Sequence, residues 1–171
     1  IIPVETEGVL TEHAIAINNG LIEAILPSNE ANSRYYSSNH IKLNNHAVIP
    51  GLINLHTHAA MTLMRGMADD LSLMSWLKNY IWPTESKYVD HGFVRDGTML
   101  ACAEMLKGGI TCFNDMYFFP QTTADVALEC GIRAGIGLVV IDMLSAYASD
   151  ADDYIDKGLA VRDHYSQRPL L

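Results

Sequence analysis

Cysteine is scarce in this sequence. The 171 residues include only Cys102, Cys112 and Cys130, and no two of them form a CxxC pair. An odd number at wide spacing argues against a disulfide framework and against a zinc site built from paired cysteines. Reduced thiols in a cytoplasmic protein are the simplest interpretation, so we expect a cytoplasmic location.

Basic side chains are also few. Eleven lysines and arginines stand against twenty aspartates and glutamates, which gives a formal net charge of −9. A general nucleic-acid binder, or a protein that binds anionic membranes, needs a basic face. We therefore expect neither a nucleic-acid partner nor a membrane partner, and we attribute the acidity to solubility.

Long hydrophobic runs are missing as well. The longest apolar stretch, GIGLVVIDML, contains Asp142 and is too short to cross a bilayer. No signal peptide is visible. The composition, 49% hydrophobic and 18% charged, is typical of a soluble globular protein with a core. Because the chain opens without methionine and stops at RPLL, we expect it to be part of a longer chain.

Residues 1–50 are predicted to be rich in β-structure. Apolar and polar residues partly alternate around Asn19-Gly20, a dipeptide that favours a hairpin turn. The polar stretch 28–40 is predicted to be a loop, and residues 41–50 a further short strand. Such a small antiparallel unit cannot close a core alone.

From Gly51 onward, strands and helices alternate. Strands are predicted at 52–56, 110–117 and 132–142, and helices at 72–82, 91–107, 122–130 and 149–165. The expected helix boundaries are Pro83 as a stop, Asp90 as an N-cap, Gly108-Gly109 and Gly131 as stops, and Ser149 as an N-cap with Asp152 three residues on. This alternation predicts parallel βαβ units.

Two histidines end the first of these strands. Side chains at i and i+2 on a strand point to one face, so His56 and His58 project together while Thr57 turns away. Imidazole nitrogens bind zinc at about 2.0–2.1 Å, and the carboxyl ends of strands are where βα folds place their chemistry. The alternative for a bare HxH is two histidines that cap the strand or bond to carbonyls.

The stretch VIPGLINLHTHAAMTLMRGMADDLSLMSWLKNYIWPTE resembles the amidohydrolase superfamily. More narrowly, it resembles the 5-methylthioadenosine/S-adenosylhomocysteine deaminases and their chlorohydrolase relatives. The likeness continues through DGTMLACAEMLKGGITCFNDMYF and covers roughly residues 48–119. The ADDLSLMSWL segment and the DMY after the second strand make it more specific than HxH alone.

The resemblance implies an α/β fold, the N-terminal part of a metal-dependent (β/α)₈ barrel with a small β-sandwich formed by both termini. Residues 1–50 would be part of the sandwich, and residues 51–171 the first three βα units of the barrel. A full barrel takes about 250 residues. The remaining metal ligands and the acid and base residues, two more histidines and an aspartate, are therefore expected beyond Leu171. His164, in a predicted helix, does not replace them.

The implied chemistry is the hydrolytic deamination of an adenine nucleoside such as 5-methylthioadenosine or S-adenosylhomocysteine. His56 and His58 would hold one divalent metal ion, with zinc expected, as neutral imidazoles oriented through their other nitrogens. The metal would make a water molecule acidic enough to supply hydroxide at neutral pH. The HxE and CxxC motifs of another zinc deaminase architecture do not occur.

Further site residues follow from the same resemblance. By this resemblance, Glu85 matches the family position that binds the ribose hydroxyls. A carboxylate suits that role, because it can accept two hydrogen bonds from a vicinal diol. Its alternative is a solvated glutamate after a helix. Trp82 is a candidate for lining the nucleoside pocket, although aromatics at helical spacing are more often core. Asp115 is either a partner for a metal-binding histidine or a structural acceptor.

Two alternatives to this function stay open. One is a chlorohydrolase or a guanine deaminase that acts on another heteroaromatic ring, and the other is a catalytically silent scaffold of amidohydrolase shape. The presence of both histidines, His56 and His58, argues against the silent scaffold. The expected partner is a small-molecule nucleoside, and the resemblance is compatible with a homo-oligomer.

Overall fold

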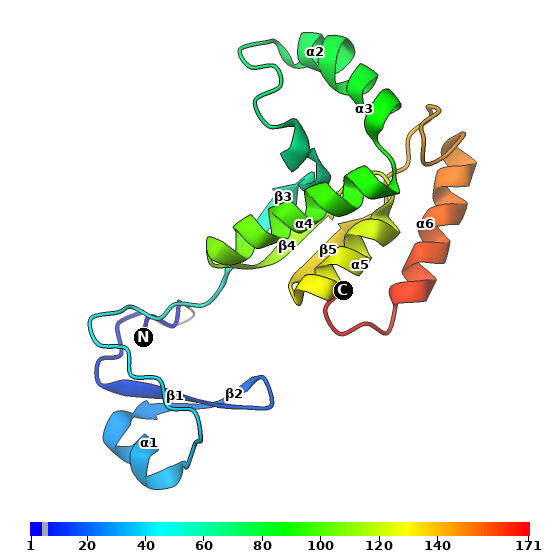
Figure 1. Cartoon of the computed structure of the whole chain (residues 1–171). Coiled ribbons are helices and arrows are strands. Elements are labelled where there is room, and N and C mark those ends of the chain that lie inside the picture. Colours follow the sequence, from blue (N-terminus) through cyan, green and yellow to red (C-terminus); the bar gives the residue numbers. More distant parts are fainter. Residues whose placement is uncertain (5–6) are drawn as a thin grey trace. The chain divides into compact units, whose positions relative to one another are not determined.

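The computed structural model describes residues 1–4 and 7–171 (Figure 1). Within these described residues the chain forms two compact units, Ile1–Pro50 and Gly51–Leu171. None of the helices formed by the described residues has the length and apolar character that crossing a membrane requires.

The first unit contains the predicted hairpin. Strand β1 (His13–Asn18) pairs antiparallel with β2 (Leu21–Pro27), so the turn at Asn19-Gly20 is confirmed. Asn19 has φ 50° and Gly20 has φ 78°. Two successive residues at positive φ give a turn whose twist matches that of the strands, and asparagine and glycine tolerate this conformation best.

Two other predictions for this unit are wrong. Residues predicted as loop form helix α1 (Ser28–Arg34), which buries Ala31 and has a Glu30–Arg34 ion pair of 2.7 Å one turn apart. Residues 41–50 form no strand. Ile2 N–H donates to the Val48 carbonyl, but a strand needs a continuous ladder of such bonds.

The second unit is built on a parallel sheet. Residues 51–171, all of them described, form strands β3 (Leu52–Thr57), β4 (Ile110–Met116) and β5 (Arg133–Gly137) in the order β3-β4-β5. The predicted parallel pairing is confirmed. The third strand is shorter than predicted, because Gly137 pairs with Met116, the last residue of β4, and the ladder ends there.

Helices α4 (His91–Lys107) and α5 (Pro120–Cys130) pack against this sheet (Figure 1). As predicted, the Asp90 carboxylate caps α4 by accepting from Phe93 N–H at 2.8 Å. Gly131 ends α5 with φ 69°, which glycine adopts without strain. The core between helices and sheet centres on Phe113, which is fully buried.

A long segment joins β3 to α4. It begins with a 3₁₀ turn (Ala59–Met64) and continues through α2 (Leu73–Trp76), a π-helical turn (Leu77–Ile81) and α3 (Trp82–Tyr88). Pro83 does not end the helix, contrary to prediction. It lies in the first turn of α3, directly after the π turn, where a missing amide proton is best tolerated.

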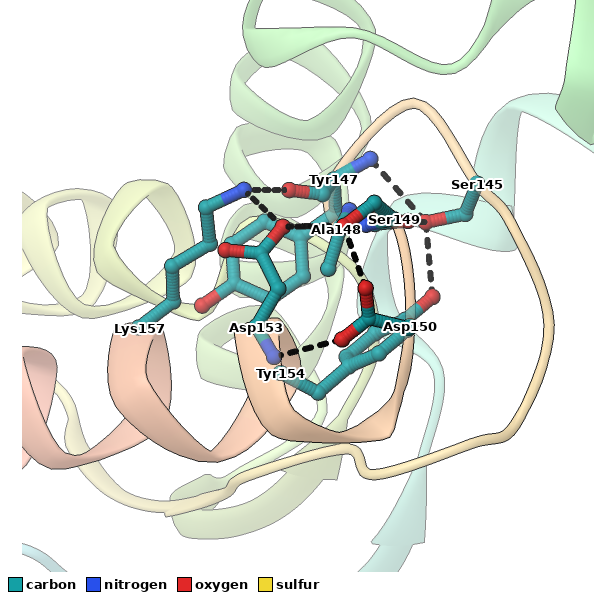
Figure 2. A network of polar contacts seen from close by, with 8 residues as sticks. All are labelled: Ser145, Tyr147, Ala148, Ser149, Asp150, Asp153, Tyr154 and Lys157. Atoms are coloured by element: carbon teal, nitrogen blue, oxygen red, sulfur yellow. Dashed lines mark hydrogen bonds and ion pairs between the residues drawn. The ribbon is translucent and has the colours of Figure 1, made fainter.

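The N-cap of the last helix, α6 (Ala151–Tyr165), lies one residue later than predicted. Its N-cap is Asp150, which accepts from Asp153 N–H at 3.0 Å, while Ser149 donates its hydroxyl to Asp150 (Figure 2). Lys157 donates to the Tyr147 carbonyl at 2.6 Å and to the Asp153 carboxylate at 2.8 Å. These bonds hold the loop after β5 against the start of α6.

Candidate functional site

The two histidines at the end of β3 lie together, as their spacing predicts. Their ring centroids are 5.2 Å apart and the ring planes are nearly perpendicular, at 81°. His56 is exposed and His58 is half-buried. Thr57 points the other way and donates its hydroxyl to Asp115 on the neighbouring strand, at 2.7 Å. The alternation of side chains along the strand therefore places the two imidazoles on one face and Thr57 on the other.

The His58 ring is oriented by the backbone of β4. Its Nδ1 lies 2.7 Å from the carbonyl oxygen of Met116, and a carbonyl can only accept. Nδ1 therefore carries a proton, and in the neutral form of the ring Nε2 presents its lone pair. A histidine whose first nitrogen donates to a carbonyl is the usual arrangement of a metal ligand.

Asp115 is buried beside the histidine pair. One carboxylate oxygen accepts from the Thr57 hydroxyl and from Ala59 N–H, both at 2.7 Å, so it contacts the chain on either side of His58. Burial raises the pKa of Asp115, and these hydrogen bonds oppose the rise. Asp115 therefore acts as a structural acceptor, and it is not the partner of the His58 ring, which bonds to Met116 instead.

Glu85 approaches the same place from α3. It lies within the helix rather than after it, and its side chain is half-buried. Its Oε1 accepts from the Tyr117 hydroxyl at 2.8 Å, and the Tyr117 ring centroid lies 6.4 Å from that of His58. Burial raises the pKa of Glu85, whereas the Tyr117 hydrogen bond and the nearby His58 lower it.

Trp82 lies three residues before Glu85 on the same helix, so the two side chains share a face of α3. Its side chain is exposed, at 37%. Trp76, one turn and a half earlier, packs against the core instead. The two tryptophans therefore differ in environment, and Trp82 is the one with surface available to a ligand.

Sequence reasoning missed Tyr117 and the Met116 carbonyl. The DMY triplet at the end of β4 was a signal for the site, but nothing local indicates that the tyrosine reaches α3. Among the described residues, no group of three or more His, Cys, Asp or Glu side chains could hold a metal. The donor set of His56 and His58 fits zinc chemically, and it could supply two ligands.

The parallel sheet carries two imidazoles and the Asp115 carboxylate at the carboxyl ends of its strands. This is the edge at which βα proteins usually place their ligand sites. Residues 47–168 match the model of the amidohydrolase family, and the chain belongs to this family.

Individual relatives are similar over all or most of the chain. It is 48% identical over 172 aligned residues to a 5-methylthioadenosine/S-adenosylhomocysteine deaminase from Saccharophagus degradans, covering 100% of this chain and 39% of the relative. A second relative of the same name, from Teredinibacter turnerae, is 44% identical, with coverage of 92% and 36%. The chain thus spans less than two fifths of the length of these curated relatives.

Solved structures agree with this likeness. An adenosine deaminase from Xanthomonas campestris with bound zinc has a TM-score of 0.89 and 43% identity, over 98% of this chain and 38% of that one. E. coli guanine deaminase has a TM-score of 0.74 at 19% identity, over 88% and 36%. The second comparison shows the fold alone.

Proposed function

We propose that the protein containing this chain is a metal-dependent hydrolytic deaminase of an adenine nucleoside such as 5-methylthioadenosine or S-adenosylhomocysteine. The observation that carries the proposal is the His56–His58 pair, with ring centroids 5.2 Å apart, beside a half-buried Glu85. The names of the Saccharophagus and Xanthomonas relatives support the same reaction class.

The proposal includes an architecture. Residues 51–171 would be the first three βα units of a (β/α)₈ barrel, and residues 1–50 part of a β-sandwich. In support, β3 pairs with β4 along one edge, and its apolar side chains Ile53 and Leu55 are 62% and 75% exposed. A strand inside a barrel has neighbours on both edges and helices over its outer face.

His56 and His58 would hold one zinc ion, with the Nε2 lone pair of His58 made available by the bond of its Nδ1 to Met116. When bound, the metal supplies the acidity that makes water a nucleophile at neutral pH. Glu85 would bind the ribose diol, and Trp82 would line the nucleoside pocket. Water replaces the amino group of the ring, and ammonia leaves. We assign the proton carriers to no residue of this chain.

The test uses the full-length protein. We expect the wild-type protein to release ammonia from 5-methylthioadenosine or S-adenosylhomocysteine. His56→Ala and His58→Ala should each lower kcat/KM by more than about 100-fold and should lower the zinc content of the protein. His164→Ala is the matched control, because His164 is exposed on α6 and should leave both quantities unchanged. Full activity in the metal-free His56→Ala variant would contradict the proposal.

The alternatives are tested by the same assay. A chlorohydrolase or a guanine deaminase would act on a chlorinated triazine or on guanine rather than on nucleosides, and a silent scaffold would act on none of them. The carboxylate of Glu85 favours a substrate with a diol, which the free bases and triazines lack.

A further inference from the structure

The end of β4 contacts both parts of the candidate site through two consecutive residues. The carbonyl of Met116 lies 2.7 Å from Nδ1 of His58, and the hydroxyl of Tyr117 donates to Oε1 of Glu85 at 2.8 Å. Glu85 lies 32 positions earlier in the chain, on a helix separated from β4 by the whole of α4. One short stretch of backbone therefore sets the position of the imidazole relative to the carboxylate.

The Tyr117 ring is itself held by packing. It is only 6% exposed and belongs to the core cluster that includes Met64, Ile81 and Val94. Ile81 ends the π turn that precedes α3, so the same core cluster also includes the segment that leads into the helix of Glu85. A ring enclosed in this way has one position for its hydroxyl, whereas a glutamate with three side-chain torsions has many orientations when free.

We propose that Tyr117 is a positioning residue that holds the Glu85 carboxylate in the orientation in which it binds the vicinal diol of the nucleoside. This inference rests on the proposed function, because it takes Glu85 as the diol acceptor. In this role Tyr117 acts through Glu85, to whose Oε1 its single hydroxyl proton is already donated.

The hydrogen-bond capacity of the carboxylate agrees with this role. A carboxylate offers about four acceptor positions on two oxygens. Tyr117 occupies one of them on Oε1, which leaves Oε2 and the remaining position on Oε1 for the two hydroxyls of a diol. The tyrosine also favours the ionised form of Glu85, since its hydrogen bond opposes the effect of burial.

The experiment compares Tyr117→Phe with wild type in the full-length protein, using 5-methylthioadenosine and its 2′,3′-dideoxy analogue. We expect the variant to raise KM for the diol substrate about tenfold, the effect of losing one hydrogen bond to a charged group, and to leave kcat within about twofold. The dideoxy analogue should show no such increase, because it makes no bond to Glu85.

The matched control is Tyr147→Phe. Tyr147 is a buried tyrosine of the same core cluster, and its hydroxyl has no hydrogen-bond partner among the described residues. Figure 2 shows it next to Lys157, in the loop before α6. Removing this hydroxyl should change KM for neither substrate.

A second readout is independent of turnover. Calorimetric titration of the metal-free protein with the deaminated nucleoside and its dideoxy analogue should show a preference for the diol that Tyr117→Phe removes. Equal effects on both ligands, or none on either, would overturn the positioning role. If the diol preference depends on Tyr117 but the full-length protein releases no ammonia, the proposed deaminase activity is refuted and the positioning role of Tyr117 stands.

Discussion

At the scale of single residues, the buried carboxylate of Asp115 is the acceptor that fixes the chain around His58. One of its oxygens accepts hydrogen bonds from the Thr57 hydroxyl and the Ala59 amide, and the residue is 1% exposed. A buried donor that loses its acceptor keeps the full penalty of desolvation. The integrity of the histidine pair therefore depends on a residue of the adjacent strand.

Replacing Asp115 by alanine should lower the free energy of unfolding by about 2–4 kcal/mol, from two unsatisfied donors and a cavity. Asp115→Asn should lose less than half as much, because the amide oxygen can still accept at the position of Oδ1. Urea denaturation monitored by circular dichroism measures both values. An equal loss in the two variants would show that the negative charge, rather than the acceptor, is what matters.

At the scale of elements, α4 passes unusually close to the turn that follows the histidines. A Cβ added to Gly97 would lie 2.3 Å from the carbonyl oxygen of Ala60 and 2.8 Å from its Cα. Backbone atoms cannot move aside as the end of a side chain can. The glycine thus allows the 3₁₀ turn after His58 to lie directly on the helix.

Gly97→Ala should therefore destabilise the protein by about 1–3 kcal/mol through overpacking, although alanine is the better helix former. Gly158→Ala, within α6, is the control, because its Cβ would lie 3.4 Å from the nearest atoms, those of Leu138, an ordinary contact. That variant should be neutral or slightly more stable. Thermal unfolding of the two variants gives the comparison, and a stabilised Gly97→Ala would contradict the close approach.

At the scale of the whole molecule, the proposed metal site would be only partly supplied by the described residues. His56 and His58 lie together, but no third His, Cys, Asp or Glu of the described residues joins them in a metal-binding group. Catalytic zinc sites use three protein ligands and keep one position open.

We accordingly predict that the 171-residue chain by itself releases no ammonia from nucleosides above a metal-only control. The full-length protein should release it under the same conditions. Circular dichroism on the isolated chain would establish that its helices are formed. Turnover by the folded 171-residue chain would show that two histidines suffice.

The local features of this chain could be predicted from the sequence because their causes act over a few residues. The Asn19-Gly20 turn, the Asp90 cap and the Gly131 stop depend on the conformational preferences of single residues, and the common face of His56 and His58 depends on strand alternation. The errors at Pro83 and at residues 41–50 arose where the preference of a single residue or short stretch did not decide the structure. At Pro83 the helix continues because a π turn directly before the proline changes the hydrogen-bond pattern, and residues 41–50 find no continuous strand partner among the described residues.

The sequence alone determined the family resemblance, the alternation of strands and helices, and the pair of imidazoles at a strand end. Only the tertiary structure decided what surrounds that pair. The bond between Asp115 and Thr57 joins residues 58 positions apart, and the bond between Tyr117 and Glu85 joins residues 32 apart. Such contacts exist only once β3 and β4 have paired in one register and α3 has packed beside them, and no local preference specifies either.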